Sequence, residues 1–155
     1  MGAVIIGRQY QDHNPNPGPV YAGGGYTPMT KALQSGAEAV TGILDKYPDL
    51  ANEISTGGAT PLHMCGMSVR NQLVTDLIIR RGGNIEAKDT YGYTPLHRMA
   101  SNNLDIGALA LLQAGADWNS TTSRGETALS IARESNARKC IDVIKNFIQE
   151  QSIKK

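Results

Sequence analysis

The chain has 155 residues, of which 40% are hydrophobic and 19% are charged, and its formal net charge is +1. This size and composition predict one globular domain and exclude both fibrous and wholly disordered proteins. The 15 basic and 14 acidic residues provide no concentrated basic face, so we expect no nucleic-acid partner. No apolar stretch approaches the roughly 20 residues of a membrane span, so we also expect no membrane partner and a cytoplasmic protein.

Residues 1–21 form an N-terminal arm whose composition differs from the rest of the chain. The segment Asn14-Pro15-Asn16-Pro17-Gly18-Pro19 cannot sustain a helix and predicts an irregular, extended conformation. Pro17-Gly18-Pro19-Val20-Tyr21 resembles the P-G-P-x-x-Y element of the sperm-tail PG-rich repeat family, found on ciliary microtubules, although the Tyr arrives one residue early. That resemblance implies an arm contact through Pro17, Gly18, Pro19 and Tyr21, and with it a cytoskeletal or ciliary location.

A short motif recurs four times after the arm, beginning at Thr27, Thr60, Thr94 and Thr127. The intervals are 33, 34 and 33 residues, and a glycine stands two residues before each Thr. The copies read Thr27-Pro28-Met29-Thr30, Thr60-Pro61-Leu62-His63, Thr94-Pro95-Leu96-His97 and Thr127-Ala128-Leu129-Ser130. A Thr accepts hydrogen bonds from free N–H groups at a helix start, and a following Pro has its φ preset for the first turn. Each copy therefore predicts the beginning of a helix.

Each motif opens a unit in which we expect two helices. Apolar residues fall on one face of the first helix at Leu96, Met99 and Ala100, and in the unit before at Leu62, Cys65 and Gly66. The second helices show stripes at Ile106, Leu109 and Leu112, and at Leu73, Leu77 and Ile78. Gly115 and Gly82 follow these helices, where a left-handed residue is needed. One such pair cannot bury its apolar face alone, so the units are expected to stack.

A 33-residue period with a T-P-L-H motif is the signature of ankyrin repeats, and the chain resembles that family over about residues 22–147. The resemblance implies an all-α solenoid of four helix–turn–helix units joined by β-hairpin-like loops. We place the repeats at about 22–54, 55–88, 89–121 and 122–147, followed by a C-terminal helix extension, within a domain of residues 22–155. The first and last units depart most from the motif and are predicted to act as caps.

The residues with reactive side chains are predicted to be structural. His63 and His97 recur at the same motif position, which favours hydrogen bonds between neighbouring units over catalysis or metal binding. Cys65 and Cys140 lie within helical apolar patterns and are expected to be buried free thiols. No residues converge as a nucleophile, an acid–base pair or a phosphate loop. We therefore predict no enzyme activity, no cofactor and no metal.

The resemblance implies a concave groove, lined by loop tips and first helices, as the surface that binds a partner protein. The positions that map to this groove are Tyr26, Met67, Tyr91, Tyr93, Ser101, Asn102, Arg124 and Glu126. Tyr and Arg are enriched among interface hot spots, so Tyr91, Tyr93, Met67 and Arg124 are expected at its centre. The alternative is that these tyrosines only shield backbone and pack on the next loop.

Two functions are consistent with the sequence. The first is an adaptor or scaffold that binds a partner protein, so far unidentified, through its groove. The second is a structural subunit of a large cytoskeletal or ciliary assembly, anchored by the N-terminal arm.

Overall fold

The computed structural model describes residues 28–153, and within this range it contains α-helices and two short 3-10 helices but no strand. The first two units comprise α1 (Pro28–Ser35), α2 (Ala37–Lys46), η3 (Pro48–Asn52), η4 (Thr56–Gly58), α3 (Pro61–Cys65), α4 (Val69–Gln72) and α5 (Thr75–Arg80). The last two units comprise α6 (Pro95–Ser101), α7 (Asp105–Gln113), α8 (Ala128–Glu134) and α9 (Arg138–Ile153). Four stacked helical units are thus present, as the motif predicted.

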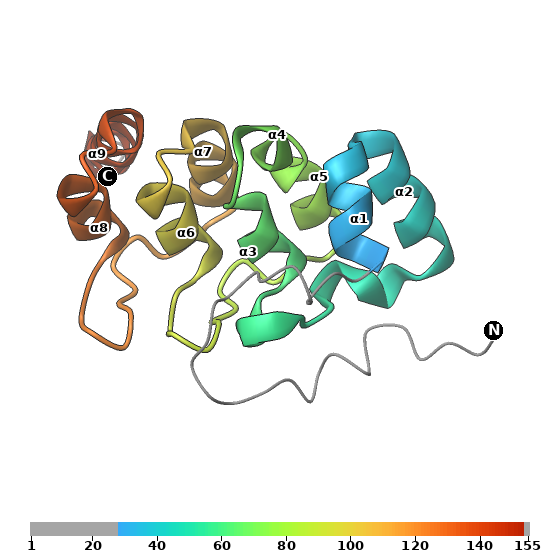
Figure 1. Cartoon of the computed structure of the whole chain (residues 1–155). Coiled ribbons are helices and arrows are strands. Elements are labelled where there is room, and N and C mark those ends of the chain that lie inside the picture. Colours follow the sequence, from blue (N-terminus) through green and yellow to red (C-terminus); the bar gives the residue numbers. More distant parts are fainter. Residues whose placement is uncertain (1–27, 154–155) are drawn as a thin grey trace.

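The helices form two rows, with the connecting loops gathered along one edge of the stack (Figure 1). The inner row contains α1, α3, α6 and α8, each in contact with the next. The outer row runs through α5, α7 and α9, with α2 beside α1 and α4 beside α3. Because each unit contacts only its neighbours, the core is a continuous layer between the rows.

The inner helices begin where the motif places them. Thr94 Oγ1 accepts from the N–H of His97, and the N–H of Thr94 donates to His97 Nδ1 at 2.9 Å. In the last unit Thr127 and Ser130 make the same reciprocal pair of bonds. These side chains satisfy backbone donors that a helix start leaves free, so each inner helix begins at the residue after its Thr.

The core consists of aliphatic and sulfur-containing side chains. Its fully buried large members are Met29, Leu33, Leu44, Leu62, Ile78, Leu96, Met99, Leu111, Leu112 and Ile144. The predicted faces of the inner helices are confirmed, since Leu96, Met99, Ala100, Leu62, Cys65 and Gly66 are all buried. In the last unit the ring of Phe147 packs edge-on against Trp118, with centroids 5.8 Å apart. That contact holds the C-terminal part of α9 against the loop that follows α7.

The predicted stripes on the outer helices are wrong at several positions. Leu112 and Ile78 are buried, but Ile106, Leu109 and Leu73 are exposed. The residues of α7 that face the core are Gly107, Ala108, Leu111 and Leu112. A Cβ on Gly107 would lie 2.4 Å from Met99 Sδ, so only a small face lets α7 approach α6 this closely. Since α7 is apolar on nearly every side, periodicity alone could not select that face.

The second unit carries one more residue than its neighbours, and its outer helix is split. α4 ends at Gln72 and α5 begins at Thr75, with a turn at Leu73–Val74 between them. In the first unit α2 ends at Lys46, before Tyr47-Pro48. The last helix, α9, continues to Ile153.

Candidate protein-binding surface

Three loops on the edge of the stack share one backbone pattern, which we call the tip loops: residues 55–59, 89–93 and 122–126. In each, the first N–H donates to the fifth carbonyl: Ser55 to Ala59 (2.8 Å), Asp89 to Tyr93 (3.0 Å) and Thr122 to Glu126 (2.9 Å). The fourth residue is Gly58, Gly92 or Gly125, each with φ between 76° and 78°. The loops also contact one another, since the N–H of Thr90 donates to the Gly57 carbonyl at 2.8 Å. Backbone bonds therefore fix the position of the side chains at the tips.

A buried ion pair supports the middle tip loop. Asp89 Oδ1 accepts from the N–H groups of Tyr91 (2.9 Å) and Tyr93 (3.0 Å). Its Oδ2 accepts from Arg98 of α6 through Nε (3.0 Å) and Nη2 (2.6 Å). The Asp89 side chain has no exposed surface and that of Arg98 is 16% exposed. The carboxylate thus holds both tyrosine backbones and anchors them to the inner helix.

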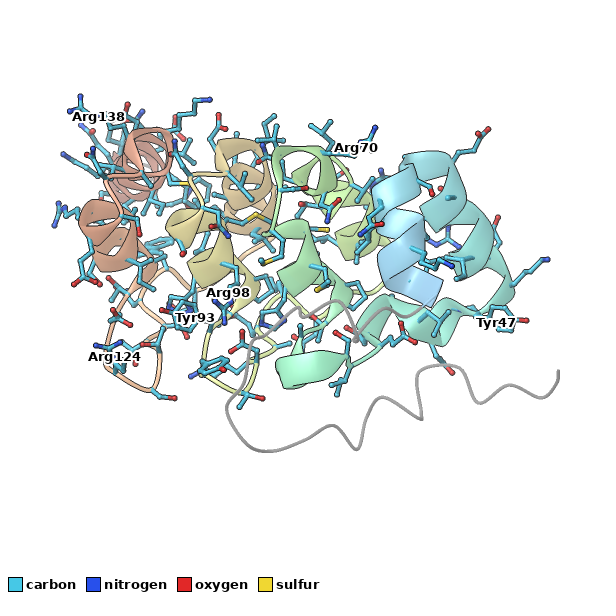
Figure 2. All side chains as sticks on the ribbon, in the orientation of Figure 1. Tyr47, Arg70, Tyr93, Arg98, Arg124 and Arg138 are labelled. Atoms are coloured by element: carbon cyan, nitrogen blue, oxygen red, sulfur yellow. The ribbon has the colours of Figure 1, made fainter. Side chains whose placement is uncertain are left out.

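The two tyrosine rings lie next to the Arg98 guanidinium. Its Cζ is 4.1 Å from the centroid of the Tyr93 ring and 5.9 Å from that of Tyr91. Tyr93 also packs edge-on against His97, with centroids 5.8 Å apart. Figure 2 shows Tyr93 and Arg98 side by side on the tip side of α6, with Arg124 on the next tip loop. Desolvation, followed by the nearby Glu126 carboxylate, raises the pKa of Tyr93, so its hydroxyl stays protonated.

Both predicted structural histidines bridge neighbouring units. Nε2 of His63 lies 2.7 Å from the Tyr93 carbonyl oxygen, and Nε2 of His97 lies 2.9 Å from that of Ser120. Because Nδ1 accepts from the Thr N–H of the same motif, Nε2 carries the proton and donates across the unit boundary. Burial lowers the pKa of His63 to about 4 and also lowers the pKa of His97. Both rings are therefore neutral at pH 7.

The structure places the predicted binding residues in two groups. Tyr91, Tyr93, Arg124 and Glu126 lie on tip loops, and we call them the tip surface; Arg124 is exposed and the other three are half-buried. Met67, Ser101 and Asn102 lie at the other ends of α3 and α6. A seven-residue helix is about 10 Å long, so the length of the inner helix separates the two groups. Tyr26 and the arm residues Pro17, Gly18, Pro19 and Tyr21 lie outside the described residues.

The helix-end group is only partly available to a partner. Met67 is 38% exposed and Ser101 is half-buried. The side chain of Asn102 donates through Nδ2 to the Gly66 carbonyl at 2.6 Å, which ties α6 to the preceding unit. The alternative expected for the tyrosines also applies in part, because Tyr93 packs against the core. Arg124, by contrast, is exposed on the next tip loop.

Sequence reasoning missed Asp89 and Arg98 as parts of this surface. They are nine residues apart, one on a loop and one on a helix, so no helical or strand period links them. The positions that match Arg98 in the second and fourth units hold Met64 and Ile131. The first unit carries Lys31 at the same position, so the charge of Arg98 did not by itself distinguish it.

The two thiols are inaccessible, and the acidic groups of the described residues form no metal-binding cluster. Cys65 and Cys140 are buried and free, as predicted, and desolvation raises the pKa of each to about 12. Among residues 28–153 no three His, Cys, Asp or Glu side chains are grouped so that they could hold a metal ion. None of the helices described is long and apolar enough to cross a membrane.

Stacked helix pairs, capped by Thr motifs and joined by glycine tip loops, define a repeat solenoid. Residues 78–132 match the model of the family described as ankyrin repeats (many copies), and this part of the chain belongs to the ankyrin-repeat family. The family is generally a non-enzymatic module for protein–protein interaction. The resemblance to ankyrin repeats that the recurring motif indicated is thus confirmed.

Several curated proteins are similar to the chain over part of their length. The RelA-associated inhibitor of Mus musculus is 37% identical over 59% of this chain, which is 12% of that protein. The BTB/POZ domain and ankyrin repeat-containing protein NPR2 of Oryza sativa subsp. japonica is 32% identical over 53% of the chain and 13% of its own length. The probable 26S proteasome regulatory subunit p28 of Saccharomyces cerevisiae is 34% identical over 57% of the chain and 38% of its own length. The chain therefore matches well under half of each relative.

Proposed function

We propose that this protein is a small adaptor or scaffold that binds a partner protein through its tip surface. The observation that carries the proposal is the placement of Tyr91 and Tyr93 over Arg98, with Asp89 fixing both their backbones and the guanidinium. Aromatic side chains held in place before binding lose little conformational entropy when a partner packs on them. Exposed Arg124 on the next tip loop adds the other residue type common among hot spots.

The names of two relatives accord with this role. One is called an inhibitor associated with RelA and another a regulatory subunit of the proteasome, and both names describe proteins that contact other proteins. The two free, buried thiols fit a reducing compartment such as the cytoplasm, which is where we propose that the protein acts.

The test begins with the full-length chain carrying a photo-crosslinking phenylalanine analogue at position 91. Tyr47 provides a matched control, since it is 46% exposed and lies at the end of α2 in the first unit (Figure 2). Proteins crosslinked in native extract at position 91, but not at position 47, are identified by mass spectrometry. Each is then purified and its dissociation constant measured.

We expect Tyr91→Ala to raise the dissociation constant at least about tenfold, the typical cost of removing a hot spot. Tyr47→Ala should leave it unchanged within about twofold, and both variants should unfold at the temperature of the unsubstituted protein. Equal loss of affinity in the two variants would contradict binding at the tip surface. If removal of residues 1–21 abolishes binding while Tyr91→Ala does not, the partner is held by the arm instead.

A further inference from the structure

Four large apolar side chains of the outer row are exposed. Val69 is 68% exposed and Leu73 62%, both at α4, while Ile106 is 50% and Leu109 38% exposed on α7. Val69 and Leu73 are four residues apart and Ile106 and Leu109 three apart, so each pair lies on one face of its helix. We call these four residues the outer ridges. They belong to the outer helices, away from the tip loops (Figure 1).

A buried hydrogen bond holds the two ridges next to each other. Gln72 of α4 is 3% exposed, and its Oε1 accepts from the N–H of Gly107 in α7 at 2.9 Å. Gln72 precedes Leu73, and Gly107 follows Ile106, so the two ridges flank this bond. This bond brings the start of α7 against α4, so the two ridges are neighbours on the outer surface of the stack.

Folding does not account for the apolar character of the ridges. The core-facing residues of these helices are Gln72, Val74 and Thr75 in the second unit, and Gly107, Ala108 and Leu111 in the third. Single exposed apolar residues are ordinary, but a contiguous group marks an interaction surface. The split between α4 and α5 places Leu73 at the turn, where it extends the ridge begun by Val69.

The charges around the ridges indicate what kind of partner fits them. Arg70, Arg138 and Lys139 are exposed. Of the carboxylates close in sequence to the ridges, Asp105 is half-buried and exposed Asp76 is paired with Arg80 at 2.9 Å. Figure 2 shows Arg70 on α4 and Arg138 at the start of α9 along the same edge of the stack, with α7 between these two helices. The Cys140 N–H donates to Asn103 Oδ1 at 3.2 Å, which fixes the start of α9 against the third unit. The outer ridges therefore have exposed cationic side chains on α4 and on α9.

We propose that the outer ridges form a second docking surface, which binds an amphipathic helix of a partner protein with an apolar stripe and acidic flanks. The apolar stripe lies between the Val69–Leu73 and Ile106–Leu109 ridges. The acidic residues face Arg70 at one side and Arg138 and Lys139 at the other. This surface is separate from the tip surface, so one chain holds two partners at once, as a scaffold requires.

The test uses two synthetic helical peptides and the full-length chain. Both peptides carry Leu at helical positions i, i+4, i+7 and i+11; one has Glu on the flanks, and the other has Lys at the same places. Binding is measured by fluorescence anisotropy, and the bound surface is mapped by chemical-shift changes in NMR spectra. We expect the Glu peptide to bind at least about tenfold more tightly, with the difference shrinking at high salt because screening weakens exposed charges.

A double variant with Val69→Ser and Leu73→Ser should weaken binding of the Glu peptide at least about tenfold. Ile153→Ser is the matched control, because Ile153 is an apolar side chain 75% exposed at the far end of α9, and binding should not change. Chemical-shift changes should be confined to residues 69–73 and 105–109 and the start of α9.

Equal binding of the two peptides would overturn the proposal, as would shift changes centred on the tip loops. If the chain self-associates and the Val69→Ser, Leu73→Ser double variant abolishes that self-association, the ridges bind a second copy of the chain instead. Binding to vesicles of anionic lipid without binding to the Glu peptide would assign them to a membrane surface.

Discussion

At the residue scale, Arg98 combines two contacts that depend on each other. Its guanidinium donates two hydrogen bonds to buried Asp89 and lies against the Tyr93 ring. The carboxylate in turn accepts from two tip-loop N–H groups. Removing the arginine charge leaves the carboxylate buried without its cation, whereas the backbone bonds alone do not neutralise it.

We predict that Arg98→Met destabilises the protein by about 3 kcal/mol, the usual cost of breaking a buried ion pair. The matched control is Arg80→Met, because Arg80 pairs with Asp76 at 2.9 Å while both side chains are about two-thirds exposed. That exposed pair should contribute less than about 0.5 kcal/mol. Urea unfolding measures both, and equal losses would show that the Asp89–Arg98 pair is energetically an ordinary surface contact.

His63 makes stability depend on pH in a defined direction. Its pKa of about 4 lies below the ordinary value of 6.5, mainly because burial disfavours the charged ring. Between these two pH values the unfolded state binds a proton that the folded state does not. The contribution of neutral His63 to the free energy of unfolding is therefore complete above pH 6.5 and is lost as pH falls toward 4. Protonation of Nδ1 would also remove the acceptor for the Thr60 N–H.

We therefore expect the free energy of unfolding to fall between pH 7 and pH 5, and His63→Gln to make that fall shallower. Urea unfolding at four or five pH values measures the slope. Since the pKa of His97 is lowered as well, some dependence should persist in the variant. Identical slopes with and without His63 would contradict the assignment.

At the element scale, the tip loops depend on glycine for two different reasons. Gly92 and Gly125 have the same φ of 78°, which strains any residue with a Cβ. A Cβ on Gly92 would also lie 2.7 Å from the backbone N of Ser123, whereas no atom lies within 4 Å of one on Gly125. The two positions separate backbone strain from close packing between loops.

Gly125→Ala should cost about 1–2 kcal/mol, because a left-handed conformation is unfavourable for alanine. Gly92→Ala should cost at least about 1 kcal/mol more, because the loops must also move apart. Thermal unfolding of the two variants compares them directly. If both lose the same stability, loop–loop contact has no energetic role in the stack.

The helices also show which kinds of element could be predicted. For the inner helices, the predicted start and the predicted buried face were both correct, because the Thr–Pro signal and the apolar spacing agree at Leu96, Met99 and Ala100. For the outer helices, the predicted presence of a second helix in each unit was correct, but several residues predicted to be buried are exposed. In α7 nearly every residue is apolar, and the approach of Met99 to Gly107 decides which side is buried.

At the scale of the whole molecule, the stack is held together by contacts between neighbouring units. The bonds from His63 to Tyr93 and from His97 to Ser120 each cross one unit boundary. The Cys140 Sγ lies 3.3 Å from the Met99 carbonyl oxygen, at the boundary between the third and fourth units. A terminal unit has one neighbour and an internal unit has two, so the ends should open first.

Thiol labelling tests this order of opening. With a pKa of about 12, neither Cys65 nor Cys140 reacts at pH 8 until its unit opens. We predict that Cys140, in the last unit, is labelled faster than Cys65, in the second, when mass spectrometry follows both in the same sample. Equal rates over a range of urea concentrations would show that the four units unfold as one.

The repeat, the inner helices, the glycines of the tip loops and the bridging role of the histidines could all be inferred from the sequence alone. These features depend on local chemistry that recurs at fixed spacing, so a single chain displays them several times. Tertiary structure decided which residues meet across units: the Asp89–Arg98 pair beneath the tyrosines, and the Gln72–Gly107 bond that aligns the outer ridges. Such contacts join residues with no common period, and only the distance between packed helices brings them together.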